Sequence, residues 1–145
     1  MQRVLLDTGA FLGYLFPIEY QRELISQHIE TLILKGVELL VPYQVLREAY
    51  ATLTRSPQNR GGFGMRPMTV VQIFRKVMES GVFCFVSENE DILQRWLNFL
   101  EKAGITSADT FDAYLVATAQ AYDVNRVVTT NPKIWQRAGI PVETS

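Results

Sequence analysis

The chain has 145 residues, of which 48% are hydrophobic and 20% are charged; this composition is typical of a folded globular protein and excludes a disordered one. A single cysteine excludes an internal disulfide, and a single histidine excludes a metal site built from several histidines of one chain. No apolar run approaches the roughly 18 residues of a membrane span, and the N-terminus lacks the pattern of a signal peptide. We therefore expect a single domain over residues 1–145, located in the cytoplasm and without membrane attachment.

Strands and helices alternate in the first half of the chain. The apolar residues 4–6 predict a buried strand that leads into Asp7. A short helix over residues 10–16, a helix over 18–35, a second strand over 37–41 and a helix over 43–54 follow in order. The prolines and glycines of residues 55–67 then predict a loop.

The second half continues the alternation. We expect a helix over residues 68–80, a strand over 82–86, helices over 88–103 and 107–122, a strand over 126–130, a helix over 132–137 and an edge strand at 140–142. Strands alternating with helices predict a parallel sheet with helices on both faces, and the continuously apolar strands agree with a sheet that is covered on both sides.

The charge is nearly balanced but unevenly distributed. The whole chain has a net charge of −1, whereas residues 51–80 contain five basic residues and one acidic residue. A basic segment in an otherwise acidic chain can bind a polyanion while the remainder binds a metal ion. An unevenly charged surface with no such partner has the same composition, so charge alone leaves both interpretations open.

Three carboxylates stand in positions that favour a metal site. Ligands of an open α/β sheet bind outside the carboxyl ends of its strands, and Asp7 directly follows the first strand. Glu48 lies on the helix after the second strand, less than a turn past an apolar pair. Asp112 interrupts the most apolar helix of the chain, with no basic residue within a helical turn. A buried carboxylate needs a cation or strong hydrogen-bond donors.

Oxygen ligands select Mg²⁺ or Mn²⁺ over zinc, and such ions activate water and neutralise charge in phosphodiester hydrolysis. The alternative is that Asp7 caps the following helix and that Asp112 binds backbone or a distant arginine. Asp109 lies three residues before Asp112, and the segment 106–109 fits a capping box. We assign Asp109 to that capping role and leave it out of the site.

Four short segments, in their order along the chain, carry a family resemblance. They are Val4-Leu5-Leu6-Asp7-Thr8, Val45-Leu46-Arg47-Glu48-Ala49, Phe111-Asp112-Ala113-Tyr114-Leu115-Val116-Ala117-Thr118-Ala119 and Val127-Val128-Thr129-Thr130-Asn131-Pro132-Lys133. Together they span nearly the whole length, and they resemble the motifs of PIN-domain proteins, above all the VapC-type toxins of bacterial toxin–antitoxin pairs.

The resemblance implies a three-layer α/β/α sandwich with a central, mostly parallel sheet, and a metal-dependent ribonuclease. It implies that Asp7, Glu48 and Asp112 are the acidic metal ligands and that a fourth acid follows the fourth strand. This chain has Asn131 there, which coordinates through its carbonyl oxygen but adds no negative charge. Thr129 matches the hydroxyl residue that the family has two positions before the fourth acid.

Further residues are assigned to the substrate. The hydroxyls of Thr8, Thr129 and Thr130 are placed to assist by hydrogen bonding. Arginines of the basic region, Arg55, Arg60 and Arg66, are expected to hold the RNA backbone. The loop around Arg60 can also be a plain flexible connector.

Other features receive structural interpretations. The segment Leu5-Leu6-Asp7-Thr8-Gly9-Ala10 also resembles the active site of retroviral-type aspartic proteases, but that fold is all-β and this chain has strong helical patterns. We expect His28 to be packed or half-exposed, Cys84 to be a buried strand residue, and Trp96 to make core or dimer contacts.

The sequence thus predicts a Mg²⁺- or Mn²⁺-dependent endoribonuclease that hydrolyses RNA phosphodiester bonds. Expected partners are RNA, a small antitoxin protein and a second copy of the chain in a homodimer. The competing hypothesis is a non-catalytic PIN-fold module that binds RNA or a protein partner, and Asn131 is the residue that supports it.

Overall fold

A parallel four-stranded sheet forms the centre of the computed structural model, which describes residues 2–18, 20–59 and 61–143. The strands are β1 (Arg3–Leu6), β2 (Glu38–Pro42), β3 (Cys84–Val86) and β4 (Arg126–Val128), in the order β3-β2-β1-β4. Every neighbouring pair is parallel; Leu5 of β1 is in register with Leu40 of β2 and with Val127 of β4. The predicted parallel sheet is confirmed, and the all-β protease fold is excluded.

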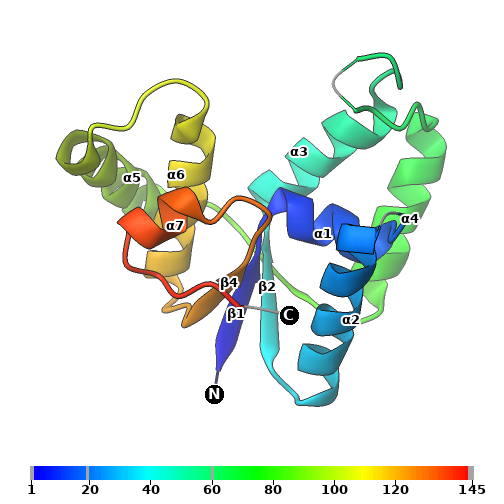
Figure 1. Cartoon of the computed structure of the whole chain (residues 1–145), viewed down its shortest axis with the longest axis horizontal. Helices are drawn as coiled ribbons and strands as arrows, with labels where there is room; N and C mark the ends of the chain where they lie inside the picture. The colour runs from blue at the N-terminus through cyan, green and yellow to red at the C-terminus, as the bar shows by residue number, and fades with distance from the viewer. Residues whose placement is uncertain (1, 19, 60, 144–145) are drawn as a thin grey trace.

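Helices cover both faces of the sheet, as predicted for three α/β/α layers (Figure 1). The helices are α1 (Thr8–Leu15), α2 (Tyr20–Leu34), α3 (Tyr43–Thr54), α4 (Pro67–Glu79), α5 (Glu90–Ala103), α6 (Asp109–Ala121) and α7 (Lys133–Arg137). Helices α1 to α4 pack on one another on one side, and α5 to α7 do so on the other. Among the described residues, no helix has the length and apolar character needed to cross a membrane.

The sheet is the most buried part of the molecule. Val4, Leu5 and Leu6 of β1 have no exposed surface, and the inner positions of β2 are equally enclosed. Strands buried on both faces need no polar alternation, which explains their continuous apolar runs. Trp135 and Ile134 anchor the short α7 to the same core.

The element boundaries differ from the sequence prediction at the sheet edges. Strand β4 ends at Val128 and not at residue 130, and residues 140–142 contribute only a bridge between Val142 and Val127. The expected burial of Cys84 is wrong: its side chain is exposed, because β3 is an edge strand of the sheet. His28 is partly buried as expected, with Nε2 3.1 Å from Oε2 of Glu143.

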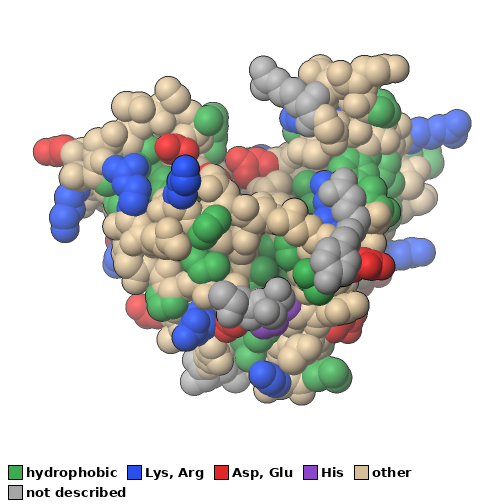
Figure 2. Space-filling model, viewed as in Figure 1, with side chains coloured by type: hydrophobic (Ala, Val, Ile, Leu, Met, Phe, Trp, Pro, Cys, Tyr) green, Lys and Arg blue, Asp and Glu red, His purple; other side chains and the backbone are tan. Residues whose placement is uncertain are grey.

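The connections between strands create a crevice at one end of the sheet. The chain leaves β1 through α1 on one side, whereas it leaves β4 toward α7 on the opposite side. The carboxyl ends of β1 and β4 therefore form a topological switch point, the place where open α/β sheets bind ligands. Figure 2 shows a notch between the two groups of helices, with acidic side chains at its floor.

Candidate active site

Asp7 stands at the switch point and is almost enclosed, with 7% of its surface exposed. Its backbone N–H donates to the carbonyl of Val128 at 3.2 Å, which joins the ends of β1 and β4. Oδ1 accepts from the N–H of Ala10 at 2.8 Å, so Asp7 caps α1. Oδ2 accepts from the hydroxyl of Thr129. The capping interpretation is thus correct, and it leaves unshared lone pairs on both oxygens.

Glu48 reaches the same place from the second turn of α3. Oε1 accepts a hydrogen bond from the hydroxyl of Thr8 at 2.6 Å, and Oε2 accepts one from Nε2 of Gln44 at 3.3 Å. The same Nε2 donates to the carbonyl of Phe111 at 2.9 Å. Gln44 therefore ties α3 to the start of α6, the helix that carries Asp112.

Asp112 lies in the first turn of α6 and is half-buried. Nδ2 of Asn131, in the loop after β4, approaches Oδ2 of Asp112 at 3.5 Å. Asn131 in turn is held by its backbone N–H, which donates to the hydroxyl of Thr129 at 2.9 Å. The four residues that the motifs single out, from four separate segments, are therefore brought to one end of the sheet.

Burial and neighbouring carboxylates raise the pKa values of Asp7 and Asp112. Burial, and to a lesser extent the charge of Asp112, raises the pKa of Asp7 from 3.8 to about 6, against the lowering effect of its hydrogen bonds from Thr129 and Ala10. The pKa of Asp112 is raised by burial, by the charge of Glu48 and by the charge of Asp109. Negative charge is thus concentrated in a site that solvates it poorly.

The types of donor gathered here are those that a hard divalent cation prefers. The groups that lower these two pKa values are hydroxyl and amide donors, and none is a Lys or Arg of the described residues. Carboxylate and amide oxygens are the ligands that Mg²⁺ and Mn²⁺ prefer. Over residues 2–18, 20–59 and 61–143, no group of three or more His, Cys, Asp or Glu side chains has an arrangement that could hold a metal ion. The carboxylate oxygens accept hydrogen bonds from the donors named above.

Comparison with known families identifies the fold, because the family model of the PIN domain matches residues 4–140. The chain belongs to the PIN domain family. No curated protein is significantly similar to it in sequence.

Several solved structures share the fold of this PIN domain. VapBC2 from Rickettsia felis, bound to a promoter DNA fragment, is 16% identical with a TM-score of 0.68, and the match covers 98% of each chain. VapC20 from Mycobacterium tuberculosis, a toxin that cleaves the sarcin–ricin loop, is 12% identical with a TM-score of 0.67, covering 94% of this chain and 95% of that one. A toxin–antitoxin complex from Klebsiella pneumoniae is 21% identical with a TM-score of 0.64, covering 97% and 96%.

Two threonine hydroxyls of the PIN domain donate hydrogen bonds directly to the carboxylates. Thr8 binds Glu48 and Thr129 binds Asp7, so both orient a proposed metal ligand. Thr130 packs over α1, where a Cβ on Gly9 would lie only 2.3 Å from its Oγ1. Glycine at position 9 therefore lets the loop after β4 approach the start of α1.

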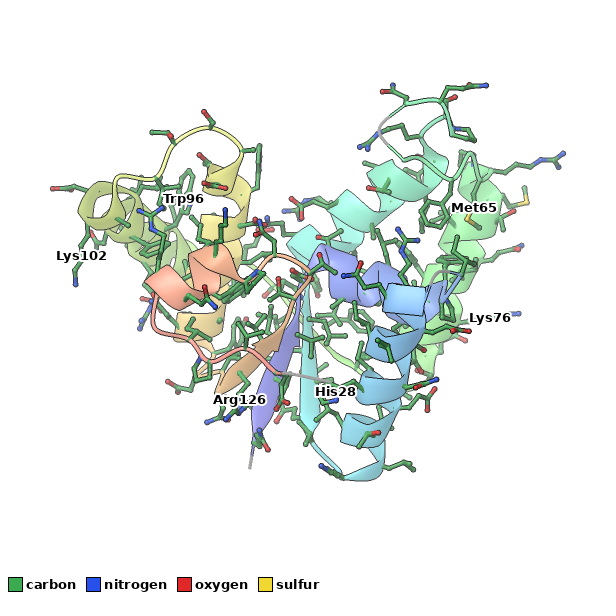
Figure 3. The ribbon with its side chains drawn as sticks, viewed as in Figure 1. His28, Met65, Lys76, Trp96, Lys102 and Arg126 are labelled. Carbon is green, nitrogen blue, oxygen red and sulfur yellow. The ribbon has the colours of Figure 1, made fainter. Side chains whose placement is uncertain are left out.

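Two of the predicted arginines, Arg55 and Arg66, lie at the ends of helices and away from the carboxylates. Arg55 follows the last residue of α3, seven positions beyond Glu48 and thus roughly 10 Å along the helix axis. Arg66 immediately precedes α4 and is exposed. Arg60 lies outside the described residues. Figure 3 places Lys76, on α4, at the outer edge of the group of helices α1 to α4, pointing away from the notch.

Two residues near the site were missed or misassigned from the sequence. Gln44 was missed, because nothing in the sequence marks it as a site residue except its position one turn before Glu48 on α3. The capping role of Asp109 is wrong: the N-cap of α6 is Ala108, which makes no side-chain cap bond, and Ser107 has a φ of 56°. Asp109 is instead the first residue of α6, close enough to raise the pKa of Asp112.

A cavity of about 410 Å³ opens beside Glu48. Its lining includes the aromatic side chains of Trp96, Tyr114 and Phe111, the last of which is 62% exposed. The indole N–H of Trp96 donates to the carbonyl of Thr110 at 3.0 Å, which fixes α5 against α6. Glu48 thus adjoins a space of a size that small ligands occupy.

Proposed function

We propose that this PIN domain is a Mg²⁺- or Mn²⁺-dependent endoribonuclease. The observation that carries the proposal is the convergence of Asp7, Glu48 and Asp112 at the switch point of the sheet, where burial and neighbouring carboxylates raise the pKa values of Asp7 and Asp112. Buried carboxylates that repel one another are stabilised by a bound cation.

Asp7, Glu48 and Asp112 would hold the metal ion, with Asn131 able to add its amide oxygen. Such an ion activates water and neutralises the charge that develops on the leaving oxygen of a phosphodiester. Thr8 and Thr129 keep the carboxylates oriented through the hydrogen bonds they donate. This positioning supports ion affinity in the way that outer-shell partners generally do.

The RNA strand is expected to lie across the notch. Thr130 is exposed beside the carboxylates and can donate to a phosphate. Arg55, Arg60 and Arg66, at the far end of α3, would bind the strand away from the scissile bond. The cavity beside Glu48 has room for a nucleotide, and its aromatic walls suit an unstacked base.

The proposal extends to a toxin of a toxin–antitoxin pair that acts in the cytoplasm. Its support is the fold shared with VapC20 and with the Klebsiella toxin–antitoxin complex. A small antitoxin is the partner expected to co-purify with the chain when its neighbouring gene is co-expressed. A homodimer is supported by the exposed Leu93 and Leu97 on α5.

The test is cleavage of single-stranded and structured RNA with Mn²⁺, Mg²⁺ or EDTA. We expect metal-dependent cleavage that falls at least 100-fold in Asp112→Asn. The matched control is Asp123→Asn, which changes an exposed carboxylate of the same lobe at a position with φ of 53° that asparagine tolerates. Full activity in Asp112→Asn would refute the assignment of Asp112.

The second candidate is a PIN-fold module that binds RNA without cutting it. Asn131 favours it, because an amide in place of a fourth carboxylate lowers the charge available for a second metal ion. This candidate predicts RNA binding that EDTA does not change and no cleavage with either metal.

A further inference from the structure

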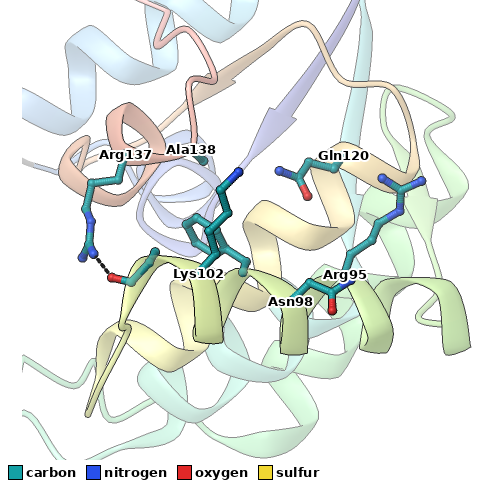
Figure 4. A pocket seen from close by; sticks show the side chains of 8 residues that line it. Arg95, Asn98, Lys102, Gln120, Arg137 and Ala138 are labelled. Carbon is teal, nitrogen blue, oxygen red and sulfur yellow. Dashed lines mark hydrogen bonds between the residues drawn. The ribbon is translucent and has the colours of Figure 1, made fainter.

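A second cavity, of about 590 Å³, lies between α5, α6 and α7 and is strongly basic. Its polar lining consists of Arg95, Asn98, Lys102, Gln120 and Arg137 (Figure 4). None of its eight lining residues is acidic. Three cations and two amides around one cavity form a site for an anion, since all of them donate hydrogen bonds.

The sequence of α5 places its basic residues on one face. Arg95, Asn98 and Lys102 are three and four positions apart, so their side chains lie along one side of the helix. In Figure 4 Arg95 and Lys102 extend from α5 over the cavity, toward Gln120 on α6. Arg95 is steadied by Asp91, 3.0 Å away, and Arg137 donates to the carbonyl of Ala103.

Positive charge continues from the candidate active site to this cavity. Helix α7 begins two residues after Asn131, and Lys133 and Arg137 are one turn apart on it. Residues 131–142 contain two basic residues, Lys133 and Arg137, and no acidic one. Figure 2 shows Lys and Arg side chains gathered on the lobe of α5 to α7, beside the notch with its acidic floor.

The distance between the candidate active site and the basic cavity suits a nucleic-acid strand that contacts both. Asp112 and Gln120 are eight positions apart on α6, about 12 Å along the helix axis. Adjacent phosphates of a stacked strand rise about 3.4 Å each, so a few nucleotides cover this distance. Arginine, lysine and side-chain amides are the usual contacts to phosphate and sugar, which position a strand without reading its sequence.

We propose that the basic cavity lined by Arg95, Lys102 and Arg137 binds the phosphates of the RNA strand that flanks the scissile bond. The inference rests on the proposed ribonuclease function and adds a specific anchoring surface to it. An acidic protein segment would meet the same cations, but the continuity of the basic residues of α7 with Asn131 favours a strand that also enters the notch.

The experiment compares Arg95→Gln/Lys102→Gln with the matched control Lys35→Gln/Arg126→Gln. Both double variants remove two positive charges. Lys35 lies between α2 and the start of β2, and Arg126 is the first residue of β4, so both control positions are at the amino ends of strands. Figure 3 shows Arg126 there, away from the notch. Circular dichroism and thermal melting establish that each variant is folded. Arg137 is left unchanged because its contact with Ala103 joins α7 to the end of α5.

Binding of a fluorescein-labelled 12-nucleotide single-stranded RNA is measured by anisotropy in EDTA, so that no cleavage is needed. We expect a roughly 10-fold loss of affinity in the cavity variant. The slope of log affinity against log salt concentration should become shallower by about 1.4, because each phosphate contact of a single strand contributes about 0.7 to that slope. The RNA affinity of the control variant should stay within twofold of that of the original chain. With Mn²⁺, KM for a long RNA rises in the cavity variant, while kcat and the cleavage of a trinucleotide are unchanged.

Each contrary result has a distinct meaning. Equal RNA affinity in the two double variants, with cleavage intact, overturns the anchoring role and leaves the ribonuclease standing. Unchanged RNA affinity together with weakened binding of poly-L-glutamate overturns it in favour of an acidic protein partner. Absence of cleavage by the unmodified chain, with RNA affinity still lost in the cavity variant, refutes the nuclease and retains the binding surface.

Discussion

Thr129, directly after β4, donates its hydroxyl hydrogen to Oδ2 of Asp7, directly after β1, although 122 positions separate the two residues. This bond lowers the pKa of Asp7, which burial raises. The same hydroxyl accepts from the N–H of Asn131 at 2.9 Å. One side chain thereby positions two of the proposed metal ligands, and it does so only because β1 and β4 are neighbours in the sheet.

Replacing Thr129 with valine should weaken metal binding while the chain remains folded. Valine keeps the shape of threonine but removes the donor to Asp7, and loss of such an outer-shell partner typically costs 10–100-fold in metal affinity. Mn²⁺ titration by calorimetry measures the effect. Thr118→Val is the control, because it removes a buried hydroxyl of α6 that donates to the carbonyl of Tyr114, within its own helix. Equal Mn²⁺ affinity in both variants would contradict the role of Thr129.

The metal-free protein should lose stability as the pH rises through the titration of Asp7. Its pKa is raised from 3.8 to about 6, so between these values the folded state retains a proton that the unfolded state has released. The free energy of unfolding therefore decreases by up to about 3 kcal/mol across this window, and Asp112 acts in the same direction.

Urea denaturation in EDTA between pH 4 and 7.5 measures this dependence. Other carboxylates add their own pH dependence, so the informative quantity is the difference between the original chain and Asp7→Asn. Asparagine remains a good helix cap and keeps the fold. We expect the free energy of unfolding of the original chain to fall relative to that of the variant as the pH rises from about 4 to about 6, and the difference to level off above that pH. A difference that is constant with pH would show that Asp7 does not titrate in this range.

Changing Asn131 to aspartate should strengthen metal binding and destabilise the metal-free protein. The new carboxylate would face Asp112, whose Oδ2 lies 3.5 Å from Nδ2 of Asn131. Because Asn131 is exposed, the added repulsion costs on the order of 1 kcal/mol. We expect roughly 10-fold tighter Mn²⁺ binding and faster RNA cleavage. If the variant binds Mn²⁺ no better, Asn131 does not occupy a ligand position.

Gly9→Ala should impair activity more than stability. A Cβ at this position would lie 2.3, 3.0 and 3.2 Å from three side-chain atoms of Thr130, so rotation of Thr130 alone does not relieve the contact. The loop carrying Thr129 and Asn131 must shift, whereas alanine stabilises a helix by about 1 kcal/mol over glycine. We expect kcat/KM to fall about 10-fold and the free energy of unfolding to change by less than about 1 kcal/mol.

Gly13→Ala is the control for that prediction. Gly13 lies one turn further along α1, and a Cβ there would meet only Ile25 and Arg22 of α2, at 3.3 Å or more. It should alter packing between two helices without changing RNA cleavage. Loss of cleavage in both variants would mean that α1 as a whole, and not the loop after β4, is disturbed.

Much of the local structure followed from patterns of neighbouring residues. The helix predicted over 43–54 is observed as Tyr43–Thr54, because Pro42 before it and Ser56-Pro57 after it limit its length. The buried β1 was recognisable from its continuous apolar run. Burial of Cys84 was predicted wrongly, since the same apolar pattern occurs in a central strand and in an edge strand, and only strand order distinguishes them.

The sequence by itself determined the parallel α/β architecture. It singled out Asp7, Glu48 and Asp112 because carboxylates at strand ends and in apolar surroundings stand out without any coordinates, and it singled out Asn131 through the family resemblance. It could not reveal that Thr129 binds Asp7, that Gln44 joins α3 to α6, or that Asp109 acts on Asp112 rather than as a cap. These contacts depend on strand order and on the angles at which helices pack. Only the tertiary structure decided them, as it decided the basic cavity, whose cations are scattered over positions 95 to 137 and meet where α5, α6 and α7 pack together.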